Sequence, residues 1–246
     1  MSKKKFVEKI NEQNNNLEVK KAIIFDSGAL ISFSLNGITE IIKDLKENFK
    51  GKFFITSEVK REIIDFPIKI KRFELEALKL KQLFDDRVLE FPSSIGIKDS
   101  EIFQKTNEIL DIANNCFVGD GKAIKLINGG EASCIALSTL LTKKGIKNVL
   151  AIDERTIRTL VENQEDLKNF LERKLHVKIK ICQTHSNFFE GFRIIRSAEL
   201  AYVAYKKGLV KLKGNNVLDA LLYAVKFKGA SISNEEIEEM KRLAKI

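Results

Sequence analysis

Four carboxylic acids occupy positions from which they could share one metal ion. Asp26 and Asp153 each follow a short apolar run directly, whereas Glu62 and Glu131 fall near the starts of predicted helices. Acids gathered in one place repel each other and raise each other's pKa unless a cation compensates. Oxygen-only ligands of this kind suit Mg²⁺ or Mn²⁺. The pattern therefore favours a carboxylate-held divalent cation.

Each of these acids also has an ordinary explanation. Asp26 and Asp153 would serve as helix N-caps. Glu131 would be a first-turn acid that the helix dipole favours, and Glu62 a solvated surface residue. Only their joint placement at one edge of a sheet, where ligands of parallel α/β folds bind, favours the metal site over these explanations.

Two neighbouring acids leave the assignment open. Glu58 lies four residues before Glu62 on the same helix face, and either carboxylate could belong to the cluster. Glu154 competes with Asp153, because side chains alternate at a strand end and only one of the two is expected to point inward.

The elements that must position these acids are those of an α/β fold. Short apolar runs alternate with helical patterns, which predicts a parallel sheet. The predicted strands are residues 21–25, 52–55, 148–152 and 177–181. The first three are uniformly apolar, as expected for strands covered on both faces. The fourth alternates apolar residues with Lys178 and Lys180, so we expect it at a sheet edge with one face exposed.

Helical periodicity fills the intervals between the strands and the C-terminal part of the chain. The predicted helices cover residues 73–89, 100–113, a segment from 132, a segment after 153, then 193–207, 216–228 and 233 onward. We therefore expect a flexible basic leader (1–20) and a main domain (21–190) with a helical insertion at about 66–126. A helical extension (191–246) would pack on that domain. Gly119, Asp120, Gly121 and Lys122 lack the spacing of a phosphate loop and predict a surface turn.

Composition narrows the class of protein. The 246 residues are 44% hydrophobic, and charges interrupt every apolar stretch before the ~18 residues of a membrane span. The N-terminus lacks the apolar core of a secretory signal. Cys116, Cys134 and Cys182 are odd in number and far apart, which argues against a disulfide framework, and His176 and His185 are too few for a histidine metal site. We expect buried free thiols and a cytoplasmic protein with no membrane association.

The chain is basic, with 43 Lys and Arg against 34 Asp and Glu and a net charge of +9. This excess favours a polyanionic partner, since phosphate neutralisation releases condensed counterions. A general enrichment in lysine would produce the same excess, so charge favours nucleic acid only modestly.

The order of the acidic segments resembles the PIN-domain family. The similar segments are residues 23–31 around Asp26, 55–63 around Glu62, 130–137 around Glu131 and 150–155 around Asp153. The tail 191–238 resembles that of an uncharacterised prokaryotic PIN subfamily. The similar segments are distributed over most of the length of the chain, although each motif is short.

The resemblance implies a three-layer αβα sandwich with a PIN-like parallel sheet and a Mg²⁺- or Mn²⁺-dependent ribonuclease. Asp26, Glu131 and Asp153 would hold the metal, Glu62 would complete the catalytic cluster, and Ser27 matches the small hydroxyl residue after the first acid. RNA is the implied partner, and a homodimer is implied because PIN-like folds often dimerise. A non-catalytic PIN-like RNA-binding or scaffold protein and the toxin of a toxin–antitoxin pair are the alternatives.

Overall fold

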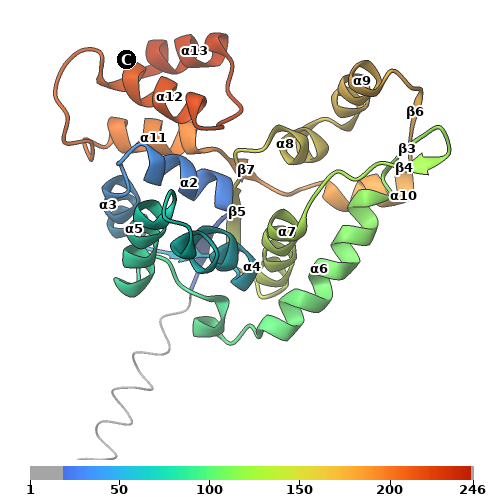
Figure 1. Cartoon of the computed structure of the whole chain (residues 1–246), viewed down its shortest axis with the longest axis horizontal. Coiled ribbons are helices and arrows are strands. Elements are labelled where there is room, and N and C mark those ends of the chain that lie inside the picture. The colour runs from blue at the N-terminus through green and yellow to red at the C-terminus, as the bar shows by residue number, and fades with distance from the viewer. Residues whose placement is uncertain (1–18, 245–246) are drawn as a thin grey trace, which may run out of the picture.

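The three uniformly apolar runs form neighbouring strands of a parallel sheet, as predicted. The computed structural model describes residues 19–244, so the predicted leader lies outside the described residues except for its last two positions. The strand order is β2-β1-β5-β7, with β1 (Lys21–Phe25), β2 (Lys52–Phe54), β5 (Lys147–Ala151) and β7 (Ile194–Ile195). Helices cover the sheet on both faces, which confirms the expected αβα arrangement (Figure 1).

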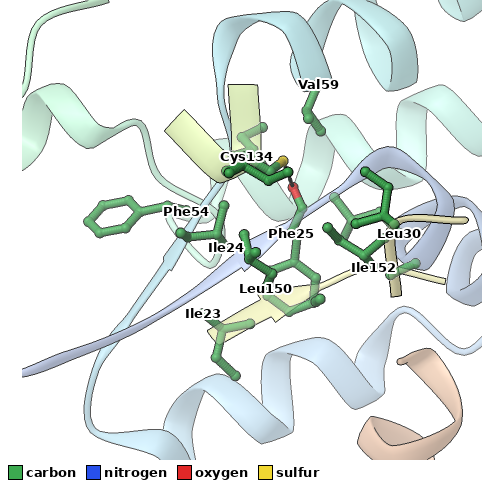
Figure 2. Close-up of a cluster of buried hydrophobic side chains, with 14 of the residues drawn as sticks. Ile23, Ile24, Phe25, Leu30, Phe54, Val59, Cys134, Leu150 and Ile152 are labelled. Atoms are coloured by element: carbon green, nitrogen blue, oxygen red, sulfur yellow. Dashed lines mark hydrogen bonds between the residues drawn. The ribbon is translucent and has the colours of Figure 1, made fainter. Parts of the chain in front are cut away.

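Strand β1 lies at the centre of the core because apolar side chains leave it in both directions. Ile23 is paired with Phe53 of β2 and with Val149 of β5. Figure 2 shows Ile24 on the side of Cys134, whereas Ile23 points the other way. Because the side chains alternate, both faces of β1 are covered by apolar contacts. These contacts fix the register of β1 with its neighbours and therefore the position of its last residues at the sheet edge.

The helices that precede β3 (Phe117–Gly119) are α2 (Ser27–Leu35), α3 (Glu40–Phe49), α4 (Ser57–Lys60), α5 (Glu74–Asp85) and α6 (Asp99–Asn114), with the short helical turns η1 (Arg61–Asp65), η2 (Pro67–Lys69) and η3 (Pro92–Ile95). Those that follow are α7 (Gly129–Lys143), α8 (Arg155–Glu162), α9 (Gln164–Leu175), α10 (Gln183–Ser186), η4 (Asn187–Phe189), α11 (Ser197–Lys206), α12 (Val217–Phe227) and α13 (Asn234–Ala244). Helix α7 packs against β1 and β5 and is covered by α6, while α11 packs against α2 and α3.

The predicted strand at 177–181 does not lie at the edge of the parallel sheet, and that prediction was wrong. Its ordered part, β6 (Ile179–Ile181), pairs with β3 (Phe117–Gly119) in a separate antiparallel sheet that also contains β4 (Lys122–Ala123). The alternating pattern fits a strand of this small sheet equally well, because an alternating strand has one exposed face wherever it pairs. The insertion that we expected to be helical therefore ends in a β-hairpin.

The fourth strand of the main sheet is instead β7, inside a segment predicted to be helical. Residues 194 and 195 pair with Leu150 and Ala151 of β5, so the predicted helix at 193–207 begins only at Ser197. Further along, Ser233 and Glu236 form reciprocal capping bonds: the Glu236 N–H donates to the Ser233 Oγ (3.1 Å) and the Ser233 N–H to the Glu236 Oε2 (2.8 Å). None of the helices between residues 19 and 244 combines the length and apolar character that a membrane crossing needs.

Candidate functional site

Asp26 lies at the carboxyl end of β1 and caps α2. Its backbone N–H donates to the Ala151 carbonyl of β5 (3.0 Å), and its Oδ2 accepts from the Gly28 N–H (3.2 Å). The side chain is 4% exposed, and within residues 19–244 its Oδ1 has no hydrogen-bond partner. Burial, with the charges of Glu131 and Glu62, raises the pKa of Asp26 to about 7, although the N–H groups of Gly28 and Ser27 oppose this shift. A cation beside Asp26 would relieve this unfavourable environment.

Glu62 reaches the site from η1, a single π-helical turn that continues α4. Such turns widen a helix locally and occur often at functional sites. The Glu62 carboxylate lies directly against Gly130, where an added Cβ would stand only 2.7 Å from Oε1 and 2.9 Å from Oε2. The absence of a side chain at Gly130 therefore makes room for Glu62 at the start of α7.

A buried hydroxyl pair holds the two elements behind this contact together. Thr56 caps α4 by accepting from the Val59 N–H (3.2 Å), and its Oγ1 lies 2.6 Å from the Ser133 Oγ of α7. The Ser133 hydroxyl is also bonded to the Gly130 carbonyl (2.6 Å). This contact between α4 and α7 places Glu62 beside Gly130, and sequence reasoning missed it because nothing in the local pattern pairs Thr56 with Ser133.

Glu131 caps a helix and also lies near other acids. As the third residue of α7 it accepts from the Asn128 N–H (2.6 Å), which is the ordinary capping-box role. Burial raises its pKa, with further contributions from the charges of Glu154 and Glu62, while the Asn128 N–H and Lys125 oppose the shift. It is therefore a cap that also belongs electrostatically to the acidic cluster.

Asp153 lies at the same sheet edge, but its carboxylate is already bound. Both Asp153 and Asp26 border Gly28, since a Cβ added there would lie 3.8 Å from the Asp153 Cβ and 3.6 Å from the Asp26 Oδ2. The Asp153 Oδ1 accepts from the Ser197 N–H and its Oδ2 from the Ser197 hydroxyl, both at 2.7 Å. Burial raises the pKa of Asp153, whereas these bonds lower it. Ser197 begins α11 two residues after the end of β7. Because β7 was not predicted from the sequence, Ser197 was not predicted as a hydrogen-bond donor to Asp153.

The neighbouring acids differ in their surroundings. Glu58 forms an ion pair with Arg61 (2.9 Å), which leaves Glu62 as the member of the cluster on this segment. Glu154 caps α8 by accepting from the Ile157 N–H (2.9 Å), and its charge raises the pKa of Glu131. The structure thus brings together Asp26, Glu62 and Glu131, with Glu154 nearby and Asp153 turned toward α11.

A divalent cation fits this arrangement chemically, although the ligands are not preassembled. Among the described residues, no three His, Cys, Asp or Glu side chains are close enough to hold a metal as they stand. However, the buried Oδ1 of Asp26 has no hydrogen-bond partner in the described part of the chain, and burial together with the charges of Glu131 and Glu62 raises the pKa of this carboxyl. Oxygen donors with uncompensated negative charge are what Mg²⁺ or Mn²⁺ binds. These side chains would have to move closer together before they could share one ion.

Comparisons with protein-family models, with curated proteins and with solved structures found no match for this chain. The PIN resemblance therefore remains a prediction that rests on the sequence segments described above.

Proposed function

We propose that this protein is a divalent-metal-dependent ribonuclease of the PIN type that hydrolyses RNA phosphodiester bonds in the cytoplasm. The observation that carries the proposal is the buried carboxylate of Asp26 near Glu62 and Glu131: its pKa is raised to about 7, and one of its oxygens has no hydrogen-bond partner among residues 19–244. A purely structural N-cap does not need two further acids beside it, whereas a cation site does. Three free cysteines agree with the reducing conditions of the cytoplasm.

Asp26 and Glu131 are the residues best placed to hold the metal, and Glu62 completes the negative charge around it. Mg²⁺ or Mn²⁺, when bound, supplies an acidified water and stabilises charge on the leaving oxygen. The chain fixes its own ligands through backbone donors, since Gly28 orients Asp26 and Asn128 orients Glu131. Asp153 remains a predicted ligand, but it must give up at least one bond to Ser197 to act as one.

RNA is the proposed substrate because the chain is basic overall and a lysine lies near the acids. The chain has a net charge of +9, and Lys125 is close enough to Glu131 to lower its pKa. Arg155 begins α8 directly after Glu154. Such cations next to a metal site would attract the phosphate backbone and position it.

The decisive test compares RNA cleavage by the wild type and by Asp26→Asn, with Mn²⁺ and with a chelator. Asparagine caps helices as well as aspartate does, so the fold should survive while the metal charge partner is lost. We expect cleavage of single-stranded RNA to require Mn²⁺ and to fall by at least about 100-fold in the variant. If the purified protein has no cleavage that is lost both with the substitution and with the chelator, the proposal is contradicted, because any remaining activity then comes from a contaminant.

A matched pair of substitutions separates catalysis from helix capping. Glu131→Gln removes a charge from the cluster, whereas Glu101→Gln changes the equivalent residue of α6, which accepts from the Lys98 N–H at 3.2 Å. Both variants alter a capping box, but only Glu131→Gln should abolish cleavage. Equal losses in the two variants would mean that Glu131 matters only for stability.

A non-catalytic PIN-like RNA-binding protein is the second candidate function. It is favoured by the lack of a preassembled three-ligand group between residues 19 and 244 and by the bonds from Asp153 to Ser197. Fluorescence anisotropy with labelled RNA distinguishes the two. Binding that is unaffected by chelator, together with no cleavage in Mn²⁺, would favour this second candidate.

A further inference from the structure

Two cysteines that are far apart in the sequence face each other across the small antiparallel sheet. The register pairs Phe117 with Ile181 and Val118 with Lys180, so the next opposed pair is Cys116 and Cys182. The Cys182 N–H donates to the Cys116 carbonyl at 2.7 Å, whereas the Cys116 N–H donates to the Ala113 carbonyl at 3.2 Å, so one backbone bond joins this pair just beyond the ends of β3 and β6. Directly opposed residues project from the same face of a sheet, so both thiols lie on one side.

We infer that Cys116 and Cys182 are a modification site that forms a reversible intramolecular disulfide with a small-molecule disulfide, such as oxidised glutathione, as the oxidant. Directly opposed residues of antiparallel strands have Cα atoms about 4.5–5.5 Å apart, within the range of about 4.4–6.8 Å that disulfides span. The inference does not depend on the proposed nuclease activity.

The two thiols have different accessibilities, which sets the order of the reaction. Cys182 is half-buried, whereas Cys116 is fully buried and its Sγ donates to the Ile112 carbonyl (3.2 Å). The Cys182 thiolate therefore attacks the small disulfide first, which forms a mixed disulfide and releases one small thiol. The Cys116 thiolate then attacks the Cys182 sulfur and displaces the second small thiol. In total two protein thiols are oxidised by two electrons and one disulfide is reduced to two thiols.

Burial makes the second step the slow one. It raises the pKa of the Cys116 thiol to about 12, with a smaller contribution from the neighbouring Cys182. Only a small fraction of Cys116 is then the reactive thiolate at neutral pH. The mixed disulfide at Cys182 should accordingly accumulate before the Cys116–Cys182 disulfide forms.

The bond would connect two segments that lead to the acidic cluster. Strand β3 continues through β4 into α7, and the Asn114 Oδ1 accepts from the N–H groups of Leu126 and Ile127 on this path (2.7 and 3.1 Å). Strand β6 follows α8 and α9, and the Glu172 Oε1 accepts from its Ile179 N–H (2.9 Å). A disulfide between β3 and β6 would thus limit separation of α7 from the α8–α9 segment.

The test follows the thiols of the full-length protein during incubation with oxidised glutathione. Samples are quenched with N-ethylmaleimide, unfolded without reductant and mapped by mass spectrometry. We expect a Cys116–Cys182 cross-linked peptide, an alkylated Cys134 and a thermal midpoint that rises on oxidation and returns with dithiothreitol. Cys134 is the internal control, because it is fully buried and its Sγ contacts the Phe25 carbonyl (3.6 Å).

Single substitutions make the order of events testable. Cys116→Ser should stop at a stable glutathione adduct on Cys182, and Cys182→Ser should form neither the adduct nor the cross-link. Circular dichroism establishes that each variant is folded. A wild type that stops at the same adduct as Cys116→Ser, or that shows no thiol loss under these conditions, would overturn the inference.

Discussion

Asp26 and Asp153 hold equivalent positions on the sheet but have opposite surroundings. Asp26 directly follows Phe25, the last residue of β1, and Asp153 comes two residues after Ala151, the last residue of β5, with which Phe25 pairs in register. Both are almost fully buried, at 4% and 3% exposure. Asp153 has donors from Ser197 on both oxygens, whereas the Asp26 Oδ2 accepts from the Gly28 N–H and its Oδ1 has no hydrogen-bond partner within the residues that the structure describes. Placement at a strand end therefore brings an acid to the edge, and the donors around it decide whether it can still bind something else.

The largest expected effect is on the pH dependence of stability without metal. The pKa of Asp26 is raised from 3.8 to about 7, so between these values the folded protein holds the proton more tightly than the unfolded chain. This contribution to stability is fully present below pH 3.8 and is lost as pH rises through about 7. A shift of this size corresponds to roughly 4 kcal/mol. The free energy of unfolding of the wild type should fall by about this amount relative to Asp26→Asn.

Urea unfolding in chelator, from pH 4 to pH 8, measures this difference. Saturating Mn²⁺ should reduce the loss in the wild type, because the cation compensates the Asp26 charge. Parallel stability curves for the wild type and Asp26→Asn would mean that Asp26 has an ordinary carboxyl environment and that the two acids do not differ.

The second expected effect is a loss of stability when Asp153 is shortened. Asp153→Ala removes both acceptors and leaves the Ser197 N–H and hydroxyl buried without partners, which should cost about 3 kcal/mol. Ser197→Ala removes one of the two bonds and should cost about 1 kcal/mol. Urea unfolding at neutral pH gives both values.

The affinity of Asp153→Ala for Mn²⁺ tests the same difference between Asp26 and Asp153. If Asp153→Ala were as stable as the wild type but lost Mn²⁺ affinity in calorimetry, Asp153 would act as a ligand like Asp26. The bonds to Ser197 would then belong only to the metal-free state.

The parts of the fold that the sequence predicts are those encoded by local pattern. Strands β1, β2 and β5 have enough consecutive apolar residues to be recognised, and the acids that follow β1 and β5 lie at the same edge because parallel strands end together. The capping box of Glu131 also follows from local spacing. Fold class and the shared edge were therefore within reach of sequence reasoning.

The parts that were missed depend on contacts between distant segments. Strand β7 has two residues, too few to show any periodicity. Because β7 was not predicted, its neighbour Ser197, which donates to Asp153, was not predicted as a partner either. The hairpin of β3 and β4 did carry a signal, because its turn residues Asp120 and Gly121 have φ of 50° and 74°. An Asp-Gly pair of this kind predicts a two-residue hairpin, which is more specific than the surface turn predicted in the sequence analysis.

The smallest expected effect tests whether Glu62 belongs, with Asp26, to the proposed metal site. Gly130→Ala places a Cβ within 2.7 Å of the Glu62 Oε1, so the carboxylate must move, while Gly129→Ala meets no atom within 4 Å. Neither glycine is among the residues with positive φ, and alanine favours a helix, so both variants should be at least as stable as the wild type. Only Gly130→Ala should weaken Mn²⁺ binding, by about tenfold, since it displaces a supporting carboxylate. Titration calorimetry on the two variants measures this, and equal affinities would remove Glu62 from the site while leaving Asp26 and Glu131 in it.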